Sequence, residues 1–172
     1  MGRYPILFWL LFAVAMAVYL TMVLWSLPHL RQMAGGLPAF DLRPTGYTPE
    51  EARALIRALA PSGADFYLNV QHWLDTAYPA LMAAVLILAF AKLARGFWIW
   101  VLAIGALVAA ACDYMENRAV AGMLRAGPDA VSDARANGAS GWTLWKSASS
   151  TVVFLALAGL LARMCWQRLR RR

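Results

Sequence analysis

Charged residues and cysteines are scarce in this chain. Only 15% of its 172 residues are charged and 62% are hydrophobic, and the mean hydropathy is +0.55. A soluble globular domain carries about 25% charged and about 45–50% apolar residues, so this balance excludes an ordinary soluble domain and indicates a membrane protein. The two cysteines, Cys112 and Cys165, form no CxxC pair, which excludes that type of redox mechanism. We expect them at opposite membrane faces, beyond the reach of a disulfide.

Four apolar stretches are long enough to cross a bilayer, which requires about 20 mostly apolar residues each. They cover approximately residues 5–27, 68–91, 97–116 and 142–164, with external loops at 28–67 and 117–141. We therefore predict an all-α, polytopic membrane protein, a single four-transmembrane-helix bundle occupying residues 1–172. The first stretch exceeds the roughly 7–15 apolar residues of a signal peptide and lacks a small-residue cleavage site, so we expect a retained span.

The two signs of charge are divided between the two sides of the predicted bundle. One group of basic residues is crowded into three short segments: Arg3, Lys92, Arg95, Arg163, Arg168, Arg170, Arg171 and Arg172. All nine acidic residues fall on the other side: Asp41, Glu50, Glu51, Asp65, Asp75, Asp113, Glu116, Asp129 and Asp133. Because short loops rich in Lys and Arg stay cytoplasmic, we predict a bacterial inner-membrane protein with both termini cytoplasmic. The tail "RLRRR" is expected to contact anionic lipid, and no nucleic-acid partner is expected.

The first external loop contains a helix signal. In "TPEEARALIRALAPSG", Thr48 suits an N-cap, Pro49 the first helical position and Glu51 the third position of a capping box. Apolar residues recur at helical spacing through Leu59, which predicts a short amphipathic helix along the membrane surface or over the bundle. The preceding "FDLRPTGY", residues 40–47, is interpreted as a turn that braces this helix.

Polar residues follow one face of the second span. Tyr67, Gln71, Asp75 and Tyr78 fall at i, i+4, i+8 and i+11, and His72 sits beside them. Pro79 follows within the span, and its ring clashes with the carbonyl of the residue four positions earlier, which is Asp75. We therefore predict a kink and a freed backbone carbonyl beside the Asp75 carboxylate.

The third and fourth spans add charges at the same depth. Asp113, Glu116 and Asn117 share one face near the end of span three, and Lys146 lies about one turn inside span four. At about 1.5 Å per residue, Asp113 lies roughly 24 Å along its helix from the cytoplasmic end, and Asp75 and Lys146 are at nearly equal depths. The three spans thus place one charge each in a common polar layer near the outer boundary of the membrane.

This polar layer is open to four interpretations. It can be a structural network in which Lys146 neutralises Asp113 or Asp75. It can be a ligand pocket open to the outside or to the outer leaflet. The i, i+3 pairs His72–Asp75 and Asp113–Glu116 could hold a metal, although one histidine is few and Lys146 would repel the cation. Proton or ion passage is disfavoured because nothing charged continues toward the cytoplasm.

Three motifs of the chain resemble motifs of a group of bacterial membrane proteins. The segments "LRPTGY", "YLNVQHWLDTAYP" and "DYMEN" resemble those of a group of small bacterial integral membrane proteins that share a Tyr-Pro pair and an Asp-x-x-Glu-Asn motif. The resemblance covers about three-quarters of the chain and implies the same four-helix fold. That group has no assigned activity, so it points to the polar layer without naming a reaction.

The functional expectation is a binding protein for a lipid or another hydrophobic ligand. Its ligand-binding residues would be those of the polar layer: Tyr67, Gln71, His72, Asp75, Tyr78, Asp113, Glu116, Asn117 and Lys146. One alternative is an accessory subunit of a larger membrane complex. Another is an enzyme acting on a lipid at the outer leaflet, with Asp113 or Glu116 as general acid/base. The sequence identifies neither a catalytic residue nor a cofactor.

Overall fold

The structure is a computed structural model that describes residues 3–170, and every regular element in that range is helical. Four helical segments are long and apolar enough to cross a membrane: Tyr4–Met33, Ser62–Leu93, Phe97–Ala126 and Asp133–Leu169. The predicted all-α four-helix class is thereby confirmed, and the chain is a multi-pass membrane protein.

Two of the membrane-spanning segments are interrupted by a wide π-helical turn. The first segment consists of α1 (Arg3–Thr21), η1 (Met22–Ser26) and α2 (Leu27–Met33). The second consists of α4 (Ser62–Phe66), η3 (Tyr67–Gln71) and α5 (His72–Leu93). The third and fourth are the single helices α6 (Phe97–Ala126) and α7 (Asp133–Leu169).

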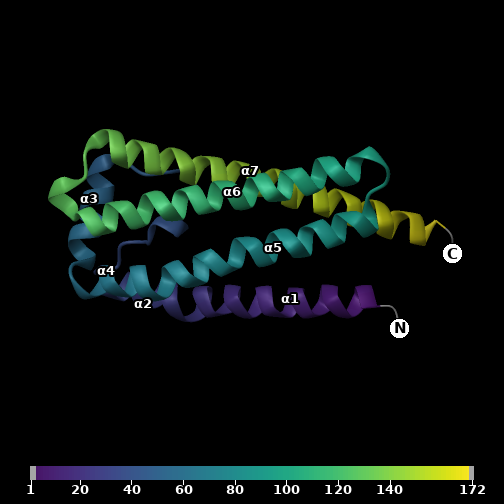
Figure 1. The fold of residues 1–172 in the computed structure, drawn as a ribbon, viewed down its shortest axis with the longest axis horizontal. Helices are drawn as coiled ribbons and strands as arrows, with labels where there is room; N and C mark the ends of the chain where they lie inside the picture. Colours follow the sequence, from purple (N-terminus) through teal and green to yellow (C-terminus); the bar gives the residue numbers. More distant parts are fainter. Residues whose placement is uncertain (1–2, 171–172) are drawn as a thin grey trace.

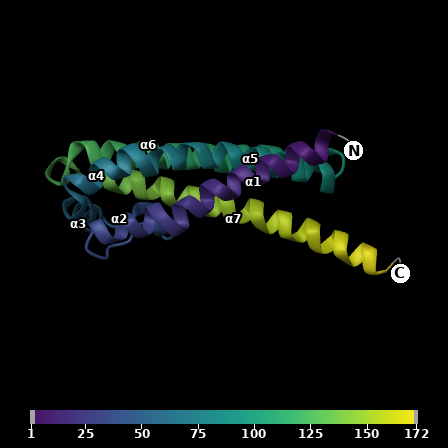
Figure 2. The same cartoon turned by 90° about the horizontal axis from the view of Figure 1, so that it is seen from below.

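The long helices are neighbours in the order α1, α5, α6, α7 (Figure 1). Residues 3 and 170 and the turn between α5 and α6 lie at one end of the molecule, which we call the terminal end. The short helix α3 (Pro49–Leu59) and the connection between α6 and α7 lie at the other end, the loop end. Toward the terminal end α7 diverges from α5 and α6 (Figure 2).

The larger apolar core lies at the loop end, beneath α3. The predicted capping box is present: the Glu51 N–H donates to Thr48 Oγ1 at 3.2 Å, and the Thr48 N–H donates to Glu51 Oε2 at 2.8 Å. The apolar stripe of α3 is buried against the bundle: Ala52, Leu55, Ile56 and Leu59. Arg53 and Arg57 pair with Asp133 and Asp129, which ties the helix to the α6–α7 connection. The amphipathic helix therefore caps the bundle.

The non-helical connection between α6 and α7 is much shorter than expected. Residues 117–141 were predicted as a loop, but α6 continues to Ala126 and α7 begins at Asp133, so the connection covers only 127–132. The apolar residues of this stretch explain the difference, because Met123 and Ala136 are buried in the core beneath α3. Within the connection, Gly127 has a φ of 78° and ends α6.

Exposed tryptophans mark both ends of the apolar surface. Trp98, Trp100 and Trp166 are exposed near the terminal end, and Trp25, Trp73 and Trp145 are exposed toward the loop end. Trp145 and Trp166 are separated by about 32 Å along α7 at 1.5 Å per residue. That span matches the roughly 30 Å hydrocarbon core of a bilayer, as expected for aromatic belts at its two boundaries.

Candidate functional site: a buried lysine and its carboxylates

Lys146 is the centre of the polar layer. Its Nζ lies 2.7 Å from Glu116 Oε2, 3.1 Å from Asp113 Oδ1 and 3.4 Å from Asp41 Oδ1. Glu116 is only 1% exposed, and the Lys146 side chain is 21% exposed. An ammonium group in hydrocarbon is costly unless it is paired, and these three carboxylates provide the pairing. We call these four residues the Lys146 cluster.

The cluster joins three separate parts of the chain. Asp113 and Glu116 are one turn apart on α6, Lys146 comes from α7, and Asp41 comes from the 3-10 turn η2 (Phe40–Leu42) in the loop between α2 and α3. Two hydroxyl groups complete it: Thr143 Oγ1 donates to Glu116 Oε1 at 2.5 Å, and Tyr67 OH donates to Asp41 Oδ2 at 2.6 Å. The segment 40–47 thus contributes a charge to the polar layer as well as bracing α3.

Asp75 belongs to a neighbouring branch of the layer. Gln71 Nε2 donates to both of its carboxylate oxygens, at 3.0 and 2.9 Å, and Ser26 Oγ donates to Gln71 Oε1 at 2.6 Å. Ser26 and Gln71 are the last residues of η1 and η3, so the two wide turns meet at this contact. Within residues 3–170 Asp75 forms no ion pair with Lys146, so Lys146 neutralises Asp113 and not Asp75.

The backbone carbonyl freed by Pro79 is used in the same branch. Asn117 Nδ2 on α6 donates to the Asp75 carbonyl oxygen at 2.9 Å, and both residues are buried. Pro79 lacks the N–H that would reach this oxygen in a regular helix, so the side chain of Asn117 replaces it. Pro79 and Asn117 therefore act as a matched pair that joins α5 to α6.

Two of the expected residues lie at the margin of the network. Tyr78 stacks on Tyr19 of α1 with ring centroids 5.8 Å apart. His72 is half-buried and lines a small cavity with Asp41 and Asp75. The four metal candidates do not converge on one point. Asp113 and Glu116 bind Lys146. Within the described residues, no group of three His, Cys, Asp or Glu residues is placed to hold a metal.

The sequence pattern did not identify several members of the network. Asp41 and Tyr47 come from a loop, Ser26 from the first span, and Ser140 and Thr143 from the predicted second loop and the start of span four. The Tyr47 N–H donates to Ser140 Oγ at 2.8 Å, which anchors the loop on α7. Burial, together with the negative charges of Glu116 and Asp41, raises the pKa of the Tyr47 phenol, so this hydroxyl remains protonated at neutral pH.

The interior of the polar layer is filled. The cavity beside Asp75 and His72 measures about 10 Å³, and the cavity below Asp113 measures about 50 Å³. A ligand pocket typically encloses about 300–1,000 Å³. The only large space among those beside the cluster in residues 3–170 is a groove of about 490 Å³ on the surface of α7. Its lining residues are Pro44, Lys146, Ser147, Ser150, Thr151, Phe154 and Leu155.

The formal charge of the layer is negative. Three carboxylates against one ammonium group leave the ionised Lys146 cluster with an excess of two negative charges, and Asp75 adds a third nearby. The only charged residue that lines the groove on α7 is Lys146, and its ammonium group is paired with these carboxylates.

Compared with known protein families, with curated proteins and with solved structures, the chain has no significant match. The resemblance to small bacterial membrane proteins with Tyr-Pro and Asp-x-x-Glu-Asn motifs therefore stays a prediction, and function has to be argued from the geometry.

Removing the central cation should destabilise the protein strongly. Lys146→Met leaves three carboxylates without their cationic partner, and we expect a loss of about 3–5 kcal/mol in the free energy of unfolding. The measurement is an SDS titration of the detergent-solubilised protein, with Lys92→Met at an exposed position as the control. Adding Glu116→Gln should recover part of the loss, and equal stability of Lys146→Met and Lys92→Met would contradict a paired cluster.

The Pro79–Asn117 pair can be tested with a double-mutant cycle. Asn117→Ala leaves the Asp75 carbonyl unpaired and should lower the free energy of unfolding by about 1–3 kcal/mol. Pro79→Ala supplies an N–H four residues after Asp75, so the same Asn117→Ala change should be much less harmful in that background. Additive effects in the cycle would mean that the two residues act independently.

Proposed function

We propose that the protein binds an amphipathic ligand in the groove on α7 beside Lys146, within the outer half of the membrane. The observation that carries this proposal is the division of the groove lining. Lys146, Ser147, Ser150 and Thr151 make one part polar, and Phe154 and Leu155 make the part farther along α7 apolar. A molecule with a polar group and a hydrophobic body matches this order when it lies along the helix.

The groove is accessible from the lipid. Phe154 is 44% exposed and Leu155 is 66% exposed, and Thr151 is also exposed on the same side of α7. Hydroxyl groups on a lipid-facing surface are hard to satisfy in hydrocarbon, although Thr151 Oγ1 donates to the Ser147 carbonyl at 2.7 Å. A ligand with its own hydrogen-bonding group would form the further hydrogen bonds that these hydroxyl groups can still accept or donate.

The charge of the Lys146 cluster selects the ligand class. Lys146 is already bound by three carboxylates, so the surroundings of the groove are net negative. An anionic group would be repelled, whereas a hydroxyl or an amine could hydrogen-bond to the exposed part of the cluster. We therefore infer a lipid or other hydrophobic ligand with an uncharged or cationic polar group.

The same polar stripe favours one second candidate, an accessory subunit of a membrane complex. Ser147 and Thr151 are small residues one turn apart on the exposed side of α7, which suits close packing of a partner helix. The enzymatic alternative has less support, because Glu116 is almost fully buried and both Asp113 and Glu116 are bound to Lys146.

We further propose that the chain resides in a bacterial inner membrane with its terminal end in the cytoplasm. No acidic residue occurs in the terminal-end part of any long helix, whereas Lys92, Arg95 and Arg163 all lie there. This distribution supports a cytoplasmic terminal end by the positive-inside rule. The exposed basic end of α7 would then contact the anionic lipid of the inner leaflet.

The ligand proposal is tested by native mass spectrometry of the protein extracted gently from its own membrane. We expect a retained small molecule in the wild type, its loss in Thr151→Phe, which fills the groove, and its retention in Val152→Phe, an adjacent exposed β-branched position outside the groove. A bare 18.9 kDa species in every sample would contradict the proposal. A reproducible heavier protein complex, disrupted by Thr151→Phe, would establish the subunit role instead.

The orientation is tested with the native cysteines. Cys165 is exposed near the terminal end and Cys112 is buried in α6. In intact cells of a Cys112→Ala variant, a membrane-impermeant maleimide should leave Cys165 unlabelled, and labelling should appear once the membrane is permeabilised. Labelling of Cys165 in intact cells would place the terminal end outside.

A further inference from the structure

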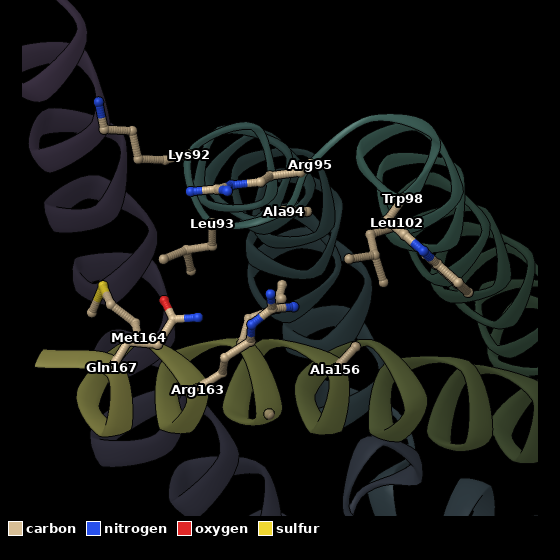
Figure 3. A pocket seen from close by; sticks show the side chains of 12 residues that line it. Lys92, Leu93, Ala94, Arg95, Trp98, Leu102, Ala156, Arg163, Met164 and Gln167 are labelled. Carbon is tan, nitrogen blue, oxygen red and sulfur yellow. The ribbon is translucent and has the colours of Figure 1, made fainter. Parts of the chain in front are cut away.

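A second hollow lies at the opposite end of the bundle from the Lys146 cluster. It measures about 570 Å³ and is bounded by the end of α5, the turn into α6 and the last turns of α7 (Figure 3). This is where α7 moves away from the other helices. Its lining residues are Lys92, Leu93, Ala94, Arg95, Trp98, Leu102, Ala156, Gly159, Leu160, Arg163, Met164 and Gln167.

The rim of this hollow is strongly basic. Lys92, Arg95 and Arg163 all line it, and no acidic residue does. In the part of the chain covering residues 3–170, none of the three forms an ion pair, although the Lys92 Nζ lies 5.7 Å from the centroid of the Tyr4 ring. Arg163 and Gln167 point from α7 toward Leu93 and Ala94 at the end of α5 (Figure 3). Arg163 and Gln167 therefore bring hydrogen-bond donors toward the space beside Arg95, while the Lys92 ammonium group is directed toward α1 (Figure 3).

The rest of the lining is apolar and reaches toward the membrane centre. Ala156, Gly159 and Leu160 precede Arg163 on α7, and Leu102 follows Trp98 by about one turn on α6. From Arg163 to Ala156 the lining extends about 10 Å along the helix axis. A Cβ atom added to Gly159 would meet no other atom within 4 Å, so this side of the hollow is open.

We propose that this hollow binds one anionic phospholipid of the adjoining leaflet. The phosphate would lie among Arg95, Arg163 and Gln167, with Lys92 at the rim, and an acyl chain would run along Gly159 and Leu160. Exposed Trp98 and Trp166 mark this level as the membrane boundary, where headgroups are found. Basic pockets between membrane helices on the cytoplasmic side recognise acidic headgroups in this way. The volume suits a headgroup and the first part of one chain.

This site differs from the groove on α7 in position and in charge. The groove lies toward the loop end, and its only charged lining residue is Lys146, which is paired with three carboxylates; this hollow lies at the terminal end and is lined by three basic residues without an ion pair in residues 3–170. Lipid binding in this hollow also differs from attraction of anionic lipid to the basic C-terminal tail, because Arg168 and Arg170 do not line the hollow. The proposal consequently does not depend on the ligand proposed for the groove.

The test is a lipid titration of the full-length protein in detergent, followed by native mass spectrometry. Phosphatidylglycerol is the anionic probe and phosphatidylcholine the zwitterionic comparison. We expect a one-to-one phosphatidylglycerol complex, and Arg163→Gln should weaken it about fivefold, the effect of one basic residue near an anionic headgroup. Arg168→Gln removes an equal charge outside the hollow and should leave the complex unchanged.

A pair of variants without charge change tests the apolar part. Gly159→Leu fills the hollow and should reduce phosphatidylglycerol binding, whereas Ala158→Leu, on the adjacent exposed position outside the lining, should not. Inorganic phosphate at millimolar concentration should not displace the lipid, because it lacks the acyl chain.

Three results would overturn the proposal. The first is equal binding of the two lipids, and the second is equal loss in Arg163→Gln and Arg168→Gln, which would indicate non-specific attraction to the basic end. The third is displacement by inorganic phosphate together with normal binding by Gly159→Leu, which would reduce the site to a phosphate contact. If a variant fails to fold, its thermal transition in detergent reveals this, and the other charge pair, Lys92→Gln against Arg170→Gln, answers the same question.

Discussion

The burial of one lysine ammonium group governs the architecture of the loop end. A cation inside the apolar part of a membrane requires close anionic partners, and Lys146 obtains them from α6 and from the loop between α2 and α3. Because Asp41 is one of them, the loop is pulled into the bundle, and Phe40 beside it becomes fully buried. Tyr47 is fixed on α7 through Ser140, and α3 follows directly as a cap on the loop-end core. The α3 cap, the loop-end core and the polar layer thus all depend on the pairing of the Lys146 ammonium group.

Much of this arrangement was predictable from residue spacing. Helical depth counted along each span put Asp113 and Lys146 at one level, and Lys146 binds Asp113. Pro79 predicted that the Asp75 carbonyl lacks its helical N–H partner, and the Asn117 side chain donates a hydrogen bond to that carbonyl. Asp41 was not predictable in this way, because it lies 105 residues from Lys146 and belongs to a loop without periodicity. The second loop was predicted too long for a related reason: polar residues and glycines suggested a turn, but Met123 and Ala136 gain burial beneath α3 by remaining helical. A contact between distant segments can override local preference in both cases.

The two hollows lie toward opposite ends of the bundle and differ in their charged residues. The only charged residue in the lining of the groove is Lys146, which is paired with three carboxylates, whereas the hollow at the terminal end is lined by basic residues that form no ion pair within residues 3–170. Their positions agree with the two tryptophan belts, so each hollow opens at one boundary of the membrane. A filled polar layer with cavities of about 10 and 50 Å³ separates them from any continuous passage.

The short connection between α6 and α7 has a consequence for how the protein enters a membrane. Three of the four charges of the Lys146 cluster belong to these two helices, which are joined by residues 127–132 alone. As a helical hairpin they carry their own counter-charges, so Asp113, Glu116 and Lys146 can enter the bilayer already neutralised to within one unit. The third carboxylate, Asp41, comes from the loop before α3. The hairpin alone therefore lacks one partner of Lys146, and the cluster is complete only when this loop is packed against α6 and α7.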